Sequence, residues 1–245
     1  MAVLYGFDLS EMSWDDMSYK KMFDARWHLR RERFVIYTVA MILCLAAQGS
    51  AMFSVFKYEH HQTHIEDLSM HTAQVHNNDF IAAAIFSVVL CTLVSTVFGI
   101  EYFLILFWPG RVYSRRWNRT KKALALLTTM GMAAAAIMST VIVSMHSERI
   151  TGVSDSTVQQ YVAEFPRPPL KYGSWPINVA YIILLWLGVA GTLSSTVLML
   201  ATATNSIPAL VGDVPEVATL NDEQSRNSSG TSRNEVMPIS EKVPV

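Results

Sequence analysis

The sequence predicts an all-α integral membrane protein, a four-transmembrane-helix bundle with both termini in the cytoplasm. Three observations predict this class: 51% of the 245 residues are apolar, 16% are charged, and four separate apolar runs are long enough to cross a bilayer. A crossing takes about 20 apolar residues, because the hydrocarbon layer is about 30 Å thick and a helix rises about 1.5 Å per residue. The net charge of -1 provides no basic excess for nucleic-acid binding, so nucleic acid is not an expected partner.

The predicted spans are residues 34–56, 80–108, 123–145 and 177–204. The first is too long for the apolar core of a signal peptide, so we expect it to stay in the membrane. The second exceeds the thickness of the hydrocarbon layer, so we expect it to tilt or to project beyond it. The fourth follows Trp175 and Pro176, and Pro208 marks its predicted end because proline does not continue a regular helix.

The distribution of Lys and Arg predicts the orientation, because cytoplasmic connections are enriched in basic residues. Residues 1–33 contain six, residues 109–122 contain six more, and the C-terminal tail contains three. On the other side, residues 57–79 contain one and residues 146–176 contain three. The sequence therefore predicts a cytoplasmic loop at 109–122 and exoplasmic loops at 57–79 and 146–176.

The segments that flank and connect the spans differ in composition. The N-terminal segment predicts an interfacial helix, because Tyr19, Phe23 and Trp27 recur every fourth residue. The tail at 205–245 is rich in Ser, Asn, Glu and Pro without apolar periodicity, so it predicts disorder. The FPRPP motif at 165–169 predicts a stiff, extended connection, with a partner-binding surface as the alternative.

Small residues recur at every fourth position along the second span. This stripe consists of Ala83, Ser87, Cys91, Ser95 and Gly99. Small residues allow helices to approach closely, and close packing holds helices together in lipid because the lipid tails are themselves apolar. Two interpretations stay open: the stripe packs within the bundle, or it contacts a lateral membrane-protein partner or a second copy of the chain.

The two cysteines, Cys44 and Cys91, lie within predicted spans. No disulfide within this chain can therefore hold an exoplasmic loop together. Tetraspanins and claudins are four-span proteins with cysteine motifs in such a loop, and the chain lacks those motifs. The chain resembles MARVEL-type proteins in its number of spans and its predicted cytoplasmic termini, and this resemblance assigns no functional residue.

Five of the seven histidines lie in the predicted loop at 57–79. If this stretch is helical, His60, His64, Asp67 and His71 share one helical face, on which imidazole and carboxylate groups are suitable ligands for Zn or Cu. Histidine ordinarily titrates near pH 6.5, so a pH-responsive loop is a second interpretation. A solvated linker with no specific role is the third. No other cofactor is expected.

Glu101 is the only acidic or basic residue within a predicted span. Such a residue usually has a partner inside the protein, and Glu101 lies about 10 Å from the cytoplasmic end of its helix. Arg33 and Arg111 are within reach, and we expect a structural ion pair between Glu101 and Arg33. Nearby basic residues form a predicted collar for anionic lipid headgroups, made of Arg115, Arg116, Arg119, Lys121 and Lys122.

The sequence contains no nucleotide-binding glycine loop and no nucleophile elbow, so we predict no catalytic residue. We expect a non-enzymatic four-span membrane protein that acts in membrane organisation or lateral partner binding. The alternative is a metal-handling or pH-responsive membrane protein, an accessory to transport, that uses the histidine loop. The plasma membrane is the default location.

Overall fold

The computed structural model describes residues 3–4, 7–8, 18, 29–108 and 113–212, with side chains described at 18, 29–108 and 113–202. Within these residues the protein is mostly helical, and four helices are long and apolar enough to cross a membrane. This confirms the predicted four-helix membrane architecture. The predicted interfacial helix around Tyr19 and residues 213–245 of the predicted disordered tail lie outside the described residues, whereas residues 205–212 of that predicted tail belong to a helix.

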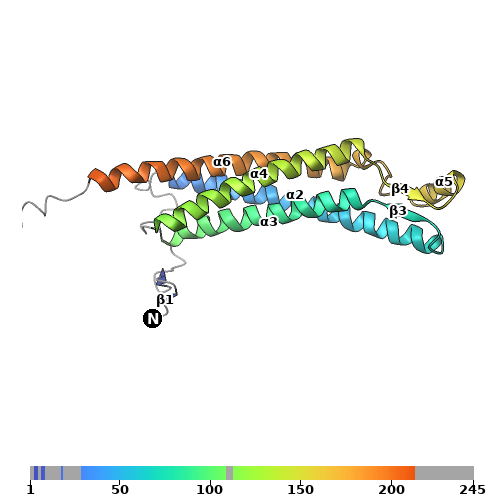
Figure 1. The fold of residues 1–245 in the computed structure, drawn as a ribbon, viewed down its shortest axis with the longest axis horizontal. Coiled ribbons are helices and arrows are strands. Elements are labelled where there is room, and N and C mark those ends of the chain that lie inside the picture. The colour runs from blue at the N-terminus through green and yellow to red at the C-terminus, as the bar shows by residue number, and fades with distance from the viewer. Residues whose placement is uncertain (1–2, 5–6, 9–17, 19–28, 109–112, 213–245) are drawn as a thin grey trace, which may run out of the picture. The chain divides into compact units, whose positions relative to one another are not determined.

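The four long helices are α2 (Arg30–Leu68), α3 (Asn78–Phe107), α4 (Arg115–Met145) and α6 (Pro176–Gly212) (Figure 1). The shorter elements are β1 (Val3–Leu4), paired with β2 (Phe7–Asp8); β3 (Gln74–His76), paired antiparallel with β4 (Arg149–Thr151); α5 (Asp155–Glu164); and the 3-10 helix η3 (Tyr172–Ser174). The Ser114 side chain caps α4 by accepting a hydrogen bond from the Trp117 backbone N (3.3 Å). Pro176 opens α6, at the position where a missing N–H removes no helical hydrogen bond.

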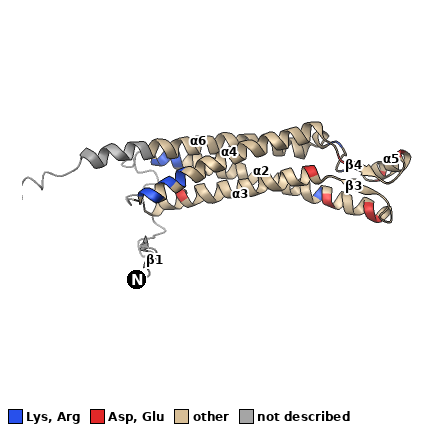
Figure 2. Cartoon of the chain, in the orientation of Figure 1, with Lys and Arg blue, Asp and Glu red and all other residues tan. Residues whose placement is uncertain are grey.

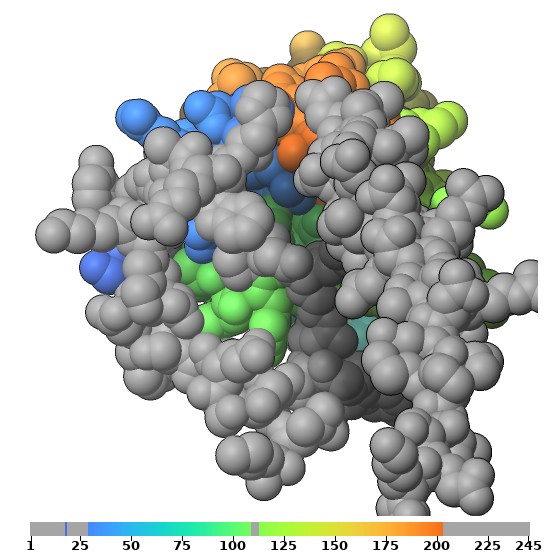
Figure 3. Space-filling view, turned by 90° about the vertical axis from the view of Figure 1, so that its left-hand side faces the viewer, coloured from blue at the N-terminus to red at the C-terminus, as the bar shows by residue number. Residues whose placement is uncertain are grey.

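The long helices follow one another around the bundle in the order α2, α3, α4, α6, and glycines permit two of the close approaches. A Cβ at Gly131 of α4 would lie 2.8 Å from the Leu90 side chain of α3. A Cβ at Gly191 of α6 would lie 3.1 Å from the Ala40 Cα of α2. Figure 3 views the end at which α2 and α4 begin, where described atoms of α2 (blue), α6 (orange), α4 (yellow-green) and α3 (green) are visible.

The outward surface of the bundle is apolar, which suits contact with lipid. Large apolar side chains are exposed on every long helix, among them Ile42 on α2, Phe103 on α3, Leu127 on α4 and Ile183 on α6. Lipid tails are equally apolar, so close packing and hydrogen bonds between helices hold such a bundle together. The functional question is therefore where the polar groups of the chain lie.

Two predicted loops are partly helical. Helix α2 continues through the first half of the predicted loop 57–79 to Leu68, and its 39 residues measure about 58 Å, roughly twice the hydrocarbon thickness. Helix α4 begins at Arg115, so the basic residues of the predicted loop 109–122 form helical turns. Both helices were expected to stop where their apolar runs stop. Residues 57–68, which follow the apolar run of α2, and residues 115–122, which precede that of α4, contain no Pro or Gly, so both helices extend into these polar residues. Helix α6 likewise passes the predicted stop at Pro208.

The end of α2 and the segment between α4 and α6 form an ordered head, here residues 58–79 and 146–175. Antiparallel pairing of β3 with β4 joins the two parts. Gly152 follows β4 with a φ of 91°, and a Cβ there would collide with the Thr72 carbonyl oxygen, so glycine is required at this approach. A small buried core supports the head, made of Ile65, Ala73 and Val75. The predicted loop at 146–176 therefore contains β4, α5 and η3 and is a folded part of the head.

Candidate functional site

Two buried glutamates lie at opposite ends of the bundle. Glu101 of α3 is 4% exposed, and Glu148, which precedes β4, is 3% exposed. A buried carboxylate is destabilising unless it is paired or hydrogen-bonded. The residues that satisfy each carboxylate define two candidate sites. They are the Glu101 cluster (Arg33, Tyr37, Glu101 and Lys121) and the Glu148 cluster (Tyr58, His61, Asn77, Glu148 and Asn178).

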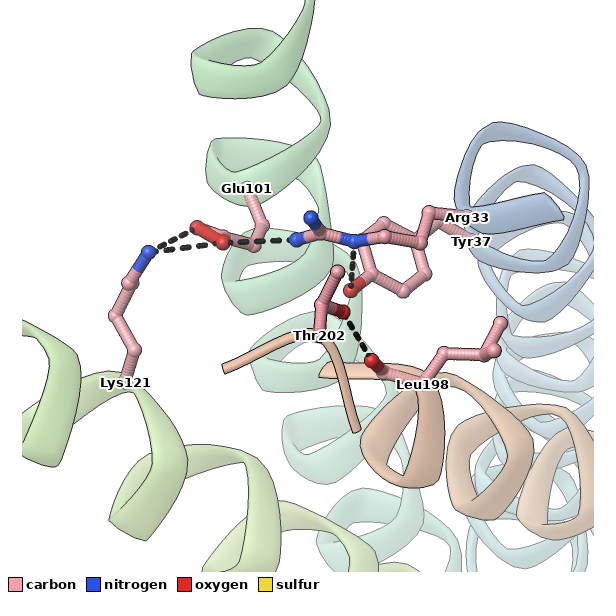
Figure 4. Close-up of polar contacts among 6 residues, drawn as sticks. All are labelled: Arg33, Tyr37, Glu101, Lys121, Leu198 and Thr202. Carbon is pink, nitrogen blue, oxygen red and sulfur yellow. Dashed lines mark hydrogen bonds and ion pairs between the residues drawn. The ribbon is translucent and has the colours of Figure 1, made fainter. Parts of the chain in front are cut away.

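In the Glu101 cluster, one carboxylate meets two cations that come from two other helices (Figure 4). Arg33 Nη2 of α2 lies 3.2 Å from Glu101 Oε1, and Lys121 Nζ of α4 lies 2.9 Å from both carboxylate oxygens. Arg33 Nε also donates a hydrogen bond to the Tyr37 hydroxyl at 3.2 Å. The structure brings Glu101 and Arg33 together and adds Lys121, which sequence analysis assigned to the lipid collar. Helices α2, α3 and α4 are joined at this point.

The predicted lipid collar lies on the first turns of α4, close to the Glu101 cluster (Figure 2). Arg115, Arg116 and Arg119 are exposed, and Lys122 is half-buried. The first turn of α4 contains no acidic residue, although the dipole of a helix favours negative charge at its N-terminus. The exposed arginines add positive charge at the same place, an arrangement that an anionic headgroup stabilises.

The Glu148 cluster joins the head to the bundle through His61 and two amide side chains. His61 Nδ1 of α2 lies 3.0 Å from Glu148 Oε2, and Asn77 Nδ2 donates to Glu148 Oε1 at 3.4 Å. Asn77 Nδ2 also lies 3.3 Å from the Tyr58 carbonyl oxygen, and Asn178 of α6 donates to the Tyr58 hydroxyl at 3.3 Å. All five residues are buried. Four segments therefore meet here: α2, the start of α3, the residue before β4, and α6.

Asp79 contacts two further residues of the head, His146 and Tyr172. Its Oδ2 lies 2.6 Å from His146 Nδ1, and its Oδ1 accepts a hydrogen bond from the Tyr172 hydroxyl at 3.1 Å. Burial, reinforced by the Asp79 carboxylate, raises the pKa of the Tyr172 hydroxyl above its ordinary value. Burial also raises the pKa of the Tyr58 hydroxyl. Both phenols therefore stay protonated at neutral pH and act as hydrogen-bond donors.

The predicted metal-ligand residues share a helix only in part. His60, His64 and Asp67 lie on the last turns of α2, whereas His71 follows the end of the helix with a φ of 61°. The rings of His60 and His64 are 6.3 Å apart. In the described part of the chain, no group of three or more His, Cys, Asp or Glu side chains is placed to hold a metal ion. The common helical face does not extend to His71, because the helix ends before it.

The small-residue stripe of α3 faces the interior of the bundle over its first half. Ala83, Ser87 and Cys91 are buried, and Ser95 and Gly99 are half-buried. The Ser87 hydroxyl accepts a hydrogen bond from the Tyr181 hydroxyl of α6 (2.6 Å) and lies 3.1 Å from Ser139 Oγ of α4. This half of the stripe makes contacts within the chain, as the first of the two interpretations expects.

The residues that bury Glu148 were not predicted, because His61, Asn77 and Glu148 lie in segments that were expected to be loops. One signal was present in the sequence. The buried face of α2 continues at Tyr58, His61 and Ile65, with the three-to-four-residue spacing of an inward helix face, beyond the end of the apolar run. That spacing predicts a helix that keeps packing outside the membrane. The burial of Glu148 has no comparable signal.

Comparison with protein-family models, with curated proteins and with solved structures found no match to this chain. Its function is therefore inferred from its own geometry.

Proposed function

We propose that this chain is a non-enzymatic four-span membrane protein that organises the membrane by binding a partner laterally within the bilayer. In this proposal both termini and the Glu101 cluster lie on the cytoplasmic side, and the head lies on the exoplasmic side. The bias of basic residues supports this orientation, because fifteen of the nineteen lie in residues 1–33, 109–122 and the tail. The plasma membrane is the default location.

One observation carries the lateral-binding proposal: Gly49 lies on the outward face of α2 with open space around it. A Cβ built at Gly49 meets nothing within 4 Å, whereas every other glycine in the described side-chain region of the long helices has an atom of a neighbouring helix within that distance. Glycine in a helix costs about 1 kcal/mol relative to alanine. Packing within the chain offsets that cost at the other glycines, and close approach of a helix from another molecule would offset it at Gly49.

The surroundings of Gly49 suit such an approach. Ala46 is exposed one turn earlier, and the Ser50 hydroxyl donates to the Ala46 carbonyl of its own helix at 2.7 Å, which satisfies this hydroxyl within the chain. Leu45 and Phe53 are exposed on either side of the glycine and provide apolar area for packing. These five residues form the α2 outer face, the surface that we assign to the partner. The buried part of the α3 stripe is already occupied by contacts within the chain.

The test compares Gly49→Leu with a matched control, Ala134→Leu, which adds a similar side chain to an exposed small position of α4. A photo-crosslinking residue at Ala46 reports lateral contacts in native membranes. We expect the crosslinked adduct to be lost in Gly49→Leu and kept in Ala134→Leu, with the same thermal stability in both. The mass of the adduct distinguishes a second copy of the chain from another membrane protein. No adduct from Ala46, or equal loss in both variants, contradicts the proposal.

The exposed arginines of α4 support a further part of the same proposal, the binding of anionic lipid headgroups. Each basic residue near an anionic surface contributes about 1 kcal/mol to such binding. Replacing Arg115, Arg116 and Arg119 by Gln is expected to reduce the anionic lipid that co-purifies with the protein, as measured by mass spectrometry. Unchanged lipid content contradicts this part and leaves the lateral-binding part standing.

A pH-responsive head is the second candidate, and the buried contact between His61 and Glu148 favours it. Histidine is the side chain whose charge ordinarily changes between pH 5 and 8. Glu148 forms no ion pair with Lys or Arg in the described residues, and the other described groups around the contact are Asn77 and Tyr58. Protection factors, which correct the exchange rate for its intrinsic dependence on pH, test this candidate. We expect higher protection factors in β3 and β4 at pH 5.5 than at pH 7.5, and no such difference in His61→Gln.

A further inference from the structure

Three sulfur atoms from three helices meet in the middle of the bundle. They belong to Cys44 of α2, Cys91 of α3 and Met132 of α4, and all three side chains are buried in one core cluster. The Cys91 thiol donates to Met132 Sδ at 4.0 Å, and the Cys44 side chain lies beside Cys91. Each residue lies near the centre of its apolar helix, so the three sulfurs share one depth in the membrane.

Two glycines bring these sulfurs together. Gly131, next to Met132, lets α4 approach α3 at Leu90, next to Cys91. On α6, a Cβ at Gly188 would lie 3.4 Å from Cys44 Sγ and 3.5 Å from Met132 Cε, so α6 closes the cluster from its fourth side. The two glycines thus leave room for the side chains at and beside the sulfurs.

The three sulfurs have the ligand chemistry of a soft-metal site, and the sulfurs of Cys91 and Met132 also have its spacing. Thiolate and thioether ligands select Cu(I) over harder cations. Three sulfurs bound about 2.3 Å from one ion in a trigonal plane lie about 4 Å from one another, which is the separation of the sulfurs of Cys91 and Met132. We propose that Cys44, Cys91 and Met132 form a binding site for one Cu(I) ion in the core of the bundle.

The charge of the bound ion fits this apolar setting. Cu(I) replaces one thiol proton, which passes to water, so that one thiolate, one thiol and one thioether surround a singly charged cation. The resulting site is neutral, which keeps the penalty for a buried net charge low. No electron is transferred in this step. Met41, one helical turn from Cys44 toward the Glu101 cluster, provides the next sulfur in the direction of the membrane surface.

This site is separate from the histidines of α2 and does not depend on lateral binding, so the two proposals stand or fall independently. The experiment offers one equivalent of Cu(I), kept reduced by ascorbate, to the full-length protein in detergent, with a colorimetric Cu(I) chelator as competitor. Copper is measured after desalting, and X-ray absorption identifies the ligand atoms. Ag(I), which has similar ligand preferences and is not readily oxidised, is measured in parallel.

We expect about one copper per chain with sulfur neighbours at about 2.3 Å. The variant Met132→Leu keeps the side-chain volume, so it is expected to fold and to bind roughly tenfold more weakly or worse after losing one ligand. The control Met199→Leu removes another buried methionine of the same core and should bind as wild type does. A variant with His60 and His64 replaced by Ala should also retain copper.

Several results overturn the proposal. Wild-type protein that retains no Cu(I) or Ag(I) lacks the site. Equal retention by Cys44→Ser or Cys91→Ser, or nitrogen and oxygen neighbours in the absorption spectrum, places the ion elsewhere. If the thiols of the purified protein prove to be joined in a disulfide that reduction and copper loading do not replace, the pair is a crosslink between α2 and α3. If the serine variants fail to fold, the comparison of copper binding by Met132→Leu and Met199→Leu still tests the proposed site.

Discussion

The two buried glutamates are satisfied in different ways. Glu101 meets an arginine and a lysine, and all three contacts are between 2.9 and 3.2 Å. Glu148 meets a histidine and an asparagine amide, at 3.0 and 3.4 Å. Glu101 lies within an apolar helix, where lipid supplies no hydrogen bonds, so full opposite charges compensate it. Glu148 is buried by the head itself, where amide donors from the chain are available.

The comparison implies that a mutation in the Glu101 cluster lowers the stability of the protein more than one in the Glu148 cluster. Replacing Glu101 by Gln leaves the partly buried Arg33 and Lys121 facing each other without an anion. Removing one member of a buried ion pair typically costs about 3 to 5 kcal/mol of unfolding free energy. We expect a loss of this size for Glu101→Gln, measured by equilibrium unfolding in mixed detergent micelles.

The control for this prediction is Glu32→Gln, which neutralises an exposed acid at the same end of α2. It should change the unfolding free energy by less than about 0.5 kcal/mol. Adding Lys121→Met to Glu101→Gln removes one of the uncompensated cations and should recover part of the loss. Equal effects of Glu101→Gln and Glu32→Gln would show that the cluster contributes little to stability.

The Glu148 cluster is expected to give a smaller effect. Glu148→Gln keeps the shape of the side chain and one acceptor oxygen, but its amide then turns toward either His61 or Asn77, which both present nitrogen atoms. The mismatch leaves one buried donor without an acceptor, at a cost of about 1 to 3 kcal/mol. Hydrogen exchange in β3 and β4 measures this loss of stability. Glu59→Gln, a change at an exposed position of α2, is the control. Protection unchanged from wild type would contradict the role assigned to Glu148.

The same contrast explains what the sequence allowed us to predict. An apolar run reports burial in lipid directly, so the four spans were recognised, and a single charge within a run, Glu101, stood out together with its reachable partner Arg33. Lys121 was assigned to the lipid collar because α4 was expected to begin at residue 123. The helix continues two turns further toward its N-terminus and turns this lysine toward Glu101.

The head was harder to predict, because its burial is created by contacts between segments distant in sequence. His61 and Glu148 are 87 residues apart, and β3 pairs with a strand that follows α4. In composition these residues resemble solvated loops, and nothing local distinguishes Glu148 from an exposed acid. The termination of α2 before His71 was also not readable, because no Pro or Gly follows Leu68 for several residues.

The Tyr172 phenol is expected to make the stability of the head, in contrast to that of the bundle, depend on alkaline pH. Its pKa is raised in the folded protein by burial and by Asp79, so the unfolded chain loses this proton first, from its ordinary pKa of about 10. The contribution to stability is therefore complete below pH 10 and falls above it, by up to about 1.4 kcal/mol per pH unit. Near-ultraviolet circular dichroism of the head should show this loss in wild type.

The variant Tyr172→Phe has no phenol to ionise and should lose stability less steeply above pH 10 than wild type. Tyr161→Phe, at a half-buried position of α5, is the matched control and should keep the wild-type slope. The same slope in all three proteins would mean that Tyr172 does not stay protonated in the folded head.

The smallest effect is expected in the middle of the bundle, where neutral hydroxyls join three helices. Ser87→Ala removes the group that contacts both Ser139 and Tyr181, which remain hydrogen-bonded to each other at 2.8 Å. Hydrogen bonds between membrane helices contribute about 0.6 kcal/mol on average, so a loss near this value is expected in the same unfolding assay. Ser194→Ala is the control, because the exposed Ser194 hydroxyl bonds to the Ala190 carbonyl of its own helix. If Ser87→Ala costs as much as Glu148→Gln, the hydroxyl contacts hold the bundle as firmly as the polar head does, and the ranking of charged, polar and neutral contacts is wrong.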